Sequence, residues 1–245
     1  MRKSFTQAAM ALALTTTTAV LPGCATTAFD YAALLGNPAR PAADTVRDAD
    51  RKPGALMAFA GIKPGSVVVE LVPGGGYYTR LLSLAVGPSG HIYTYSTRAS
   101  AAVDEWAKTN PNVTPQVAQA GLPLAPVPAD VVWTTLNYHD FKNNKVGDTD
   151  LAAVINQAAF TALKPGGVYL INDHQTASGI GLAQTATLHR IEDTAVIREV
   201  EAAGFKLEAR SPVLEHPADD HTMKVQETGI RGKTDQFVLR FRKPR

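Results

Sequence analysis

The sequence contains a single cysteine among 245 residues, which excludes an intrachain disulfide framework and a cysteine-rich zinc module. It carries Lys+Arg 24 against Asp+Glu 22, a net charge of +2 that is too small for a nucleic-acid-binding surface. Charged residues make up 19% and hydrophobic residues 45% of the chain, which argues against a disordered protein. We therefore expect a globular domain whose function depends on a localised site for a small-molecule substrate. These data leave the oligomeric state open.

Residues 1–24 have the parts of an export signal. A basic start precedes a short apolar stretch over residues 8–20, which is too short to remain as a membrane span. The segment 21–23, Leu-Pro-Gly, comes directly before Cys24 and resembles the lipobox of bacterial lipoproteins, where the cysteine thiol is joined to diacylglycerol. The alternative is plain secretion with cleavage after Ala28. Either outcome predicts export, and lipidation predicts a periplasmic protein anchored to the membrane.

The rest of the chain alternates short β-branched runs with amphipathic segments of about ten residues. We predict a tether and a loose N-terminal cap over residues 25–50 and one α/β domain over residues 51–245. The alternation predicts a parallel sheet with helices on both faces. Strands are predicted at 67–71, 91–95, 113–118, 130–136, 168–173, 206–214 and 236–241, and helices at 51–60, 78–86, 100–108, 151–163 and 192–203.

A glycine-rich segment follows the first predicted strand and begins a helix. A dinucleotide-binding fingerprint in this frame would place glycines at 72, 74 and 77, but Val72 and Tyr77 occupy two of those positions. The residues present, Glu70 with Gly74 and Gly76, instead have the spacing acid-x-x-x-Gly-x-Gly. This spacing suits a nucleoside that carries a carboxylate-bearing tail, whereas the alternative is a tight turn without a ligand.

Residues 70–79 resemble motif I of class I S-adenosylmethionine-dependent methyltransferases. More narrowly, they resemble an exported bacterial family of predicted methyltransferases whose loop reads acid-x-x-Pro-Gly-Gly-Gly-aromatic-Tyr-Thr. The similarity extends through 137–140, 163–167, 201–205 and 232–237, and it covers about residues 40–245. The resemblance implies a Rossmann-like, seven-stranded, mostly parallel sheet whose last strand is antiparallel, with S-adenosylmethionine as the cofactor.

The resemblance also implies roles for particular residues. Gly74 and Gly76 would approach the methionine and ribose of the cofactor, and Glu70 would orient the loop or the ligand's amino group. The family pattern places an acid on the ribose hydroxyls at the end of the second strand, but residues 93–97 contain no carboxylate. The amide of Gln119 can accept a hydrogen bond from the adenine amine. The predicted cofactor-binding set is Glu70, Pro73, Gly74, Gly75, Gly76, Tyr95, Ser96, Gln119 and Asn137.

Candidate catalytic residues follow the fourth predicted strand. Methyl transfer from a sulfonium is an in-line displacement, and a neutral acceptor benefits from a nearby base. We predict His139 as that base, with Asn137 or Asp140 as its orienting partner. The alternative is that His139 and Asp140 cap the loop and form hydrogen bonds with the backbone. Asp173 and His174, after the next strand, are predicted to contact the substrate or to form a solvent-exposed loop pair.

Two further polar clusters have open interpretations. Residues 189–192 belong either to the substrate side of the cleft or to a salt-bridged helix start. Residues 219–221 read Asp-Asp-His, but three adjacent residues rarely face one ion. We therefore predict an exposed acidic turn there and no metal site in the chain.

The leading functional hypothesis is an exported methyltransferase acting on a small molecule or an envelope component. S-adenosylmethionine is made in the cytoplasm, so an exported protein meets little of it. That tension motivates an alternative: an exported, non-catalytic ligand-binding module that retains the methyltransferase fold. A nucleotide-dependent oxidoreductase is disfavoured by the glycine spacing.

Overall fold

The computed structural model describes Met1, residues 29–120 and residues 124–245. The predicted export signal, Cys24 and the possible cleavage site after Ala28 lie outside the described residues. Within the described part of the chain, no helix combines the length and the apolar composition needed to span a bilayer.

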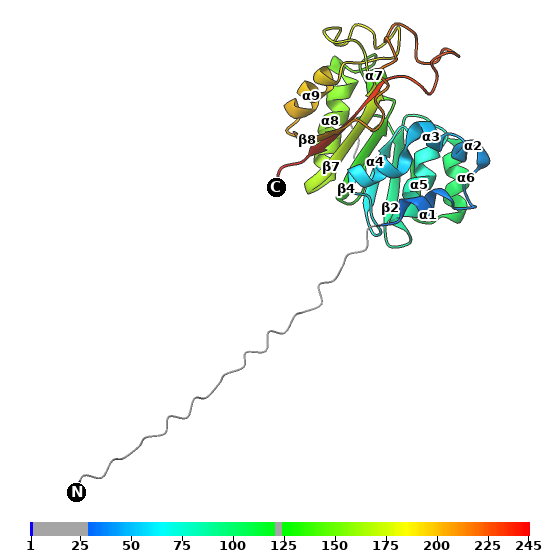
Figure 1. Cartoon of the computed structure of the whole chain (residues 1–245), viewed down its shortest axis with the longest axis vertical. Helices are drawn as coiled ribbons and strands as arrows, with labels where there is room; N and C mark the ends of the chain where they lie inside the picture. The colour runs from blue at the N-terminus through cyan, green and yellow to red at the C-terminus, as the bar shows by residue number, and fades with distance from the viewer. Residues whose placement is uncertain (2–28, 121–123) are drawn as a thin grey trace.

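Seven strands form one sheet in the order β3-β2-β1-β4-β7-β9-β8 (Figure 1). The first five run parallel to one another, and β9 is antiparallel to both of its neighbours. The strands are β1 (Val67–Leu71), β2 (His91–Ser96), β3 (Val113–Val117), β4 (Ala129–Thr135), β7 (Leu163–His174), β8 (Lys206–Ser211) and β9 (Gln236–Arg242). This confirms the predicted seven-stranded, mostly parallel sheet with an antiparallel last strand.

In the described residues, four short helices precede β1, and the other helices lie between later strands. The helices are α1 (Tyr31–Leu35), α2 (Ala42–Thr45), α3 (Asp48–Arg51), α4 (Pro53–Ala60), α5 (Tyr77–Val86), α6 (Ala101–Thr109), α7 (Tyr138–Phe141), α8 (Leu151–Ala162) and α9 (Asp193–Ala202). A small hairpin, β5 (Lys145–Val146) and β6 (Thr149–Asp150), precedes α8. The side chain of Ser100 caps the start of α6 by accepting the backbone N–H of Val103.

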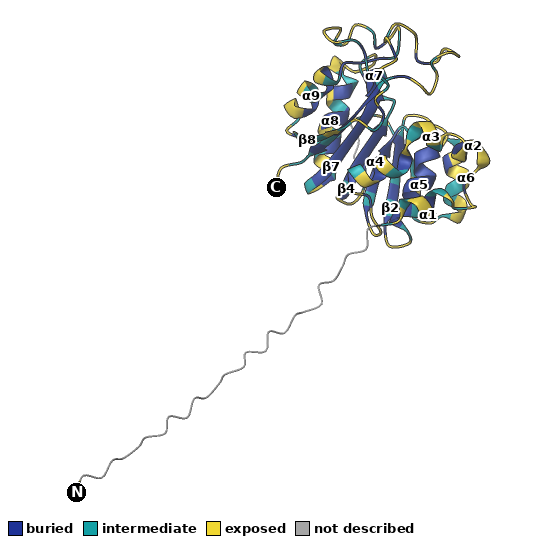
Figure 2. Cartoon of the chain, viewed as in Figure 1, coloured by how far each residue is buried: buried dark blue, intermediate teal, exposed yellow. Residues whose placement is uncertain are grey.

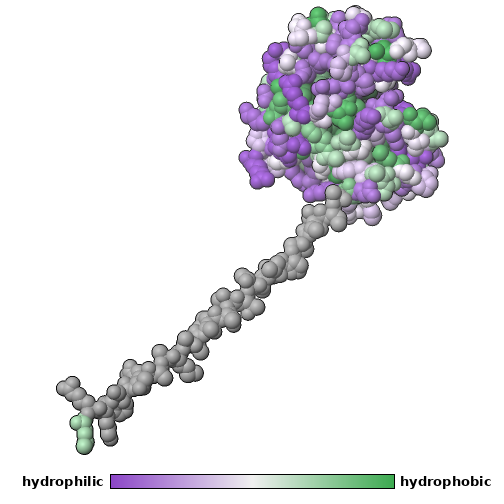
Figure 3. All heavy atoms as spheres, viewed as in Figure 1, coloured by the Kyte–Doolittle hydropathy of each residue, from purple (hydrophilic) through white to green (hydrophobic). Residues whose placement is uncertain are grey.

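The core lies on both faces of the sheet, because successive side chains of a strand point to opposite sides. Val68 of β1 packs in one cluster with Met57 and Leu81, whereas Val69 packs in the other with Ile155. Figure 2 shows the strands buried between helices whose outer faces are exposed. Each fully buried side chain of this size contributes about 1.5–3 kcal/mol. On the face drawn in Figure 3, hydrophobic residues are interspersed with hydrophilic ones.

The N-terminal segment differs from the loose cap that we predicted, since α1, α2 and α3 lie within it. Asp44 of α2 forms a buried ion pair with Arg80 of α5 at 2.6 Å. Asp48 of α3 accepts a 2.6 Å hydrogen bond from the Tyr77 hydroxyl and pairs with Arg40. These contacts fix the short helices against the first turns of α5, directly behind the glycine-rich segment.

Two predicted strand boundaries are also wrong. Strand β7 begins at Leu163, five residues before the predicted start at residue 168, because Leu163 pairs with Ala129 across a register shift. Strand β8 ends at Ser211, three residues before the predicted end at Leu214.

Candidate active site

The candidate site lies at the carboxyl ends of β1 and β4, where the strand order reverses direction. Such a switch point in a parallel sheet leaves a crevice, because the two following segments turn to opposite faces. The glycine loop, residues 72–76, follows β1, and residues 136–141 follow β4. The long connections over residues 175–192 and 212–235 gather at the same end of the sheet, beside α7 (Figure 1).

Three cavities share lining residues along this crevice. The β2-side cavity, about 860 Å³, joins the smaller glycine-loop cavity, about 210 Å³, at Gly74 and Asn137. The glycine-loop cavity in turn meets the histidine cavity, about 690 Å³, at Tyr78 and Leu136. Asp140 lines both larger cavities. The three cavities therefore adjoin one another along the crevice, with the smallest in the middle, and we call this row of cavities the trough.

The glycines of the loop differ in whether they face a cavity or pack against the protein. Gly74 lies in the left-handed region (φ 54°), and a Cβ added to Gly74 or to Gly75 would meet no atom within 4 Å. Both residues line the glycine-loop cavity, so their missing side chains leave its floor open. A Cβ on Gly76 (φ 75°) would lie 3.0 Å from Arg80 and 3.2 Å from Val103. Gly76 therefore allows close packing behind the loop and, contrary to our prediction, does not line these cavities.

Three of the five described non-glycine residues with a left-handed backbone line the trough. Val72, Leu136 and His189 have φ angles of 51°, 58° and 56°, a region that non-glycine residues rarely adopt. Each such residue costs about 1–3 kcal/mol, and the cost is large for a β-branched residue such as Val72. All three line the cavities. Strain of this kind persists where the surrounding structure enforces it, and it often accompanies a ligand site.

Glu70 has one of the two roles predicted for it, that of holding the glycine loop, and its contact with a ligand's amino group stays a prediction. Its carboxylate accepts a 2.5 Å hydrogen bond from the Thr79 hydroxyl, which ties the end of β1 to the first turn of α5. The residue is 3% exposed and lines the glycine-loop cavity. Burial raises the pKa of Glu70 to about 7, against the lowering effects of the Thr79 hydrogen bond and the Arg80 charge. A bound ammonium group beside this carboxylate would favour the ionised form.

This raised pKa predicts a pH-dependent stability. Since the folded-state pKa exceeds the ordinary value of 4.5, the Glu70 contribution is fully present below pH 4.5 and is lost as pH rises through 7. We expect Glu70→Gln to gain about 3 kcal/mol of unfolding free energy relative to wild type between pH 4.5 and pH 8. Urea unfolding of both proteins across this range measures the difference. A difference that stays constant with pH would contradict the assignment.

The β2-side cavity holds the other predicted cofactor residues. Tyr95, Ser96 and Gln119 all line it, and the Tyr95 hydroxyl donates a hydrogen bond to the backbone carbonyl of Gln119. Phe141 lies on its wall. Among the described lining residues, Asp140 alone carries a carboxylate, and it belongs to α7 rather than to the end of β2. The ribose acid of the family pattern therefore has no counterpart at the end of β2.

Asn137 links the two sides of the switch point. Its Nδ2 donates to the carbonyl of Thr135 at 2.6 Å and to the carbonyl of Val72 at 3.4 Å. It lines the β2-side and glycine-loop cavities, together with Pro73. The structure gives Asn137 no hydrogen bond to His139, so the predicted orienting role is wrong. The short Asn137 side chain instead reaches back to the ends of β4 and β1.

Asp173 is the residue that orients His139. Its carboxylate accepts the backbone N–H of His139 at 2.8 Å and lies 2.7 Å from the Nδ1 of the same ring. It also accepts the backbone N–H of His174 at 2.7 Å. Asp173 is fully buried at the end of β7 and does not line the cavities, so the predicted substrate contact is wrong.

The two histidines beside Asp173 have opposite shifts. Burial favours the neutral ring of His139, but the charge and hydrogen bond of Asp173, with the charge of Asp140, outweigh it and raise the pKa of His139. Burial is the main cause that lowers the pKa of His174 to about 4. His174 bonds the Thr234 hydroxyl through Nδ1 at 2.8 Å and lines the histidine cavity, rather than lying in an exposed loop.

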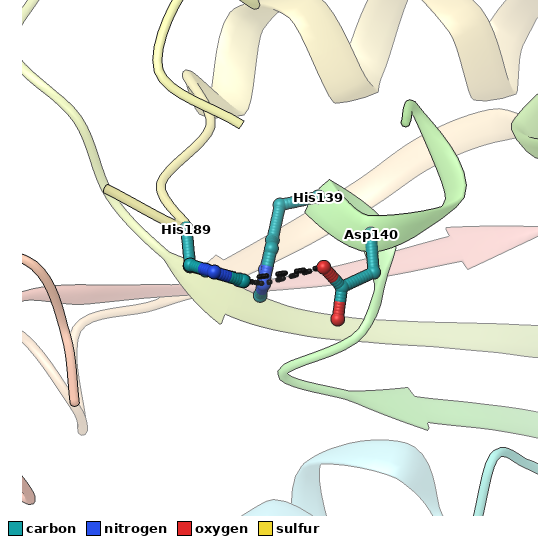
Figure 4. A group of neighbouring side chains, drawn as sticks. All are labelled: His139, Asp140 and His189. Carbon is teal, nitrogen blue, oxygen red and sulfur yellow. Dashed lines mark hydrogen bonds and ion pairs between the residues drawn. The ribbon is translucent and has the colours of Figure 1, made fainter. Parts of the chain in front are cut away.

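Asp140 and His189 lie on the other side of the His139 ring (Figure 4). The Nε2 of His139 is 3.2 Å from Nδ1 of His189 and 3.5 Å from Oδ1 of Asp140. Asp140 therefore contacts the outward-facing nitrogen of the ring and not Nδ1, the nitrogen that an orienting partner holds. His189 comes from the connection over residues 175–192. From the sequence we named it only as one residue of the polar cluster 189–192.

A buried ion pair anchors the connection that carries His189. Arg190 is fully buried and forms two hydrogen bonds with Asp219, at 2.8 and 3.1 Å. It also donates to the carbonyls of Gln175 and Met223. Our prediction of an exposed acidic turn is thus wrong for Asp219, which is 6% exposed. The pair holds two long connections together over the end of β7.

Known proteins resemble this chain in their three-dimensional structure. No protein-family model and no curated protein matches the sequence. A SAM-dependent methyltransferase from Aquifex aeolicus matches 88% of this chain and 100% of its own, at 15% identity and a TM-score of 0.58.

Two other solved structures show how widely this fold is used. The [4+2]-cyclase SpnF matches 80% of this chain and 81% of its own, at 15% identity and a TM-score of 0.58. Fibrillarin from Aeropyrum pernix, solved with natively bound S-adenosyl-L-methionine, matches 80% of this chain and 76% of its own, at 17% identity and a TM-score of 0.51. The chain therefore has the Rossmann-like fold of class I methyltransferases.

Proposed function

We propose that this chain binds S-adenosylmethionine along the glycine loop and transfers its methyl group to a small acceptor in the histidine cavity. The observation that carries the proposal is the trough of three adjoining cavities, of which the smallest, in the middle, is floored by Gly74 and Gly75. The fold supports it, because several proteins of this fold are methyltransferases and one holds this cofactor.

The chemistry of each cavity fits a part of the cofactor. The β2-side cavity offers the side of Phe141 and the polar groups of Ser96 to an adenosyl group. The glycine-loop cavity offers the Glu70 carboxylate to an ammonium and Arg51 to a carboxylate. A sulfonium between them would direct its methyl group toward the histidine cavity, where His139 presents Nε2.

Calorimetric titration of residues 25–245 tests the proposal. We expect saturable, micromolar binding of S-adenosylmethionine and of S-adenosylhomocysteine, and none of NAD, because the glycine spacing does not suit a pyrophosphate. The absence of heat at millimolar S-adenosylmethionine would contradict the proposal.

A second candidate is a non-catalytic, exported binding module with the same fold. It is favoured by the missing carboxylate at the end of β2, and the cyclase SpnF shows that the fold also serves proteins named for other reactions. An assay of methyl transfer from the cofactor to envelope fractions distinguishes the two candidates. A chain that binds the cofactor but methylates none of these fractions would be the non-catalytic binding module.

The proposed setting is the periplasmic side of a bacterial membrane, with Cys24 as the site of lipid attachment. We expect Cys24→Ser to move the protein from the membrane fraction to the soluble periplasmic fraction, because the residue then has no thiol to receive diacylglycerol. Fractionation followed by immunoblotting measures this. A wild-type protein that is already in the soluble periplasmic fraction would contradict lipidation and support plain secretion with cleavage after Ala28.

A further inference from the structure

His139, Asp140 and His189 place three ligand-type atoms at the corners of a nearly equilateral triangle (Figure 4). The separations are 3.2 Å between the two ring nitrogens, 3.5 Å from His139 Nε2 to Asp140 Oδ1, and 3.4 Å from His189 Nδ1 to the same oxygen. Ligand atoms 2.0–2.1 Å from a tetrahedral zinc ion lie about 3.3 Å apart. The triangle therefore already has the size of one face of such a coordination sphere.

The buried carboxylate of Asp173 prepares His139 for this role. It lies 2.7 Å from Nδ1 and holds the backbone of the same residue, so both the tautomer and the orientation of the ring are set. With the proton on Nδ1, the lone pair of Nε2 is directed to the triangle. A carboxylate behind a ligating imidazole is the usual arrangement around protein-bound zinc.

The backbone that carries His189 is anchored by contacts on its C-terminal side. The backbone of His189 itself is strained, with φ at 56°, and the next residue, Arg190, is locked into a buried pair with Asp219. The backbone of the following residue, Ile191, forms hydrogen bonds with His174 at the end of β7 and with Thr176 just beyond it. A ring placed at this energetic cost suggests a purpose beyond filling space.

We propose that His139, Asp140 and His189 bind one first-row divalent transition-metal ion, with a fourth position open to the histidine cavity. All three residues line that cavity, so a molecule within it has access to the ion. Two imidazoles and one carboxylate suit Zn²⁺ and its neighbours, whereas Mg²⁺ and Ca²⁺ prefer oxygen ligands. This site differs from residues 219–221 and revises our prediction that the chain has no metal site.

The ion would change how an acceptor is activated. With Nε2 of His139 bound to the metal, the ring could no longer act as the base. The ion would instead bind an acceptor hydroxyl or thiol and favour its deprotonated form. This consequence rests on the proposed methyl transfer, whereas metal binding itself does not.

Metal titration of the full chain, stripped beforehand with a chelator, tests the proposal without any activity assay. We expect one equivalent of Zn²⁺ by calorimetry and one of Co²⁺ by visible absorption. His189→Gln and Asp140→Asn should weaken binding about 10-fold or more, and Asp173→Asn about 10–100-fold. His91→Gln is the matched control, since His91 lies at the opposite end of β2 beside Thr114 and should leave binding unchanged.

Asp140 and His189 are partly exposed, so their substitution leaves no buried cavity, and thermal unfolding of each apo variant verifies its fold. Absence of saturable Zn²⁺ binding at about 100 μM, or equal binding by wild type and His189→Gln, would overturn the site. In that outcome the three side chains form a metal-free hydrogen-bonded cluster. Titration of the stripped protein with S-adenosylmethionine separates this failure from a failure of the proposed function.

Discussion

Replacing Gly74 with leucine is expected to reduce the affinity for S-adenosylmethionine about 100-fold or more, because the new side chain occupies the floor of the cofactor trough. Gly74 lines both the β2-side and the glycine-loop cavities, and a Cβ at this position meets no protein atom within 4 Å. The added carbons therefore enter the space that we assign to the ligand. Calorimetry with S-adenosylmethionine measures the effect.

Gly61→Leu is the matched control for this prediction. Gly61 is also in the left-handed region (φ 75°), and its Cβ also meets no atom within 4 Å, but it ends α4 outside the trough. Both variants should lose about 1–2 kcal/mol of stability from the same backbone cost. If the two variants bind the cofactor equally well, Gly74 does not face it.

Replacing Arg190 with alanine is expected to lower the free energy of unfolding by about 3–5 kcal/mol, because it leaves the Asp219 carboxylate buried without its partner. The side chains of this pair are 0% and 1% exposed. The substitution also releases the carbonyls of Gln175 and Met223 from their hydrogen bonds. Urea unfolding near pH 7 measures the loss.

Lys108→Ala, which removes an exposed ion pair, is the control for the loss of the buried Arg190–Asp219 pair. Lys108 and Glu105 form an exposed pair on α6, with side chains 67% and 72% exposed, and solvent screens such a pair strongly. Its removal should leave stability unchanged within error. A loss for Arg190→Ala that is no larger would show that the 175–192 connection is held by other contacts.

Much of the sheet could be predicted because its signals are local. Buried β-branched runs such as residues 67–71 mark parallel strands, and the glycine loop marks the start of α5. The three short N-terminal helices were missed for the opposite reason. Residues 42–51, which form two of the three, have no apolar periodicity, and these two helices are stabilised by distant partners, above all Arg80 and Tyr77.

The site was predicted in part for the same physical reason. His139 follows β4 whereas Asp173 lies at the end of β7, and the register of the sheet rather than their sequence spacing brings them within hydrogen-bonding distance. His189 is positioned by Arg190 and Asp219, a pairing across 29 residues that no local pattern indicates. The sequence predicted which residues lie at the carboxyl ends of the strands. Their hydrogen-bonding partners depend on contacts between distant segments, which form only in the folded chain.

A crystal structure of the chain with S-adenosylhomocysteine tests the central claim most directly. We predict the adenosyl group beside Tyr95 and Ser96, the homocysteine tail against Gly74 and Glu70, and the sulfur atom facing the histidine cavity. A glycine-loop cavity filled by the side chain of Val72, or a ligand bound away from the loop, would contradict the account.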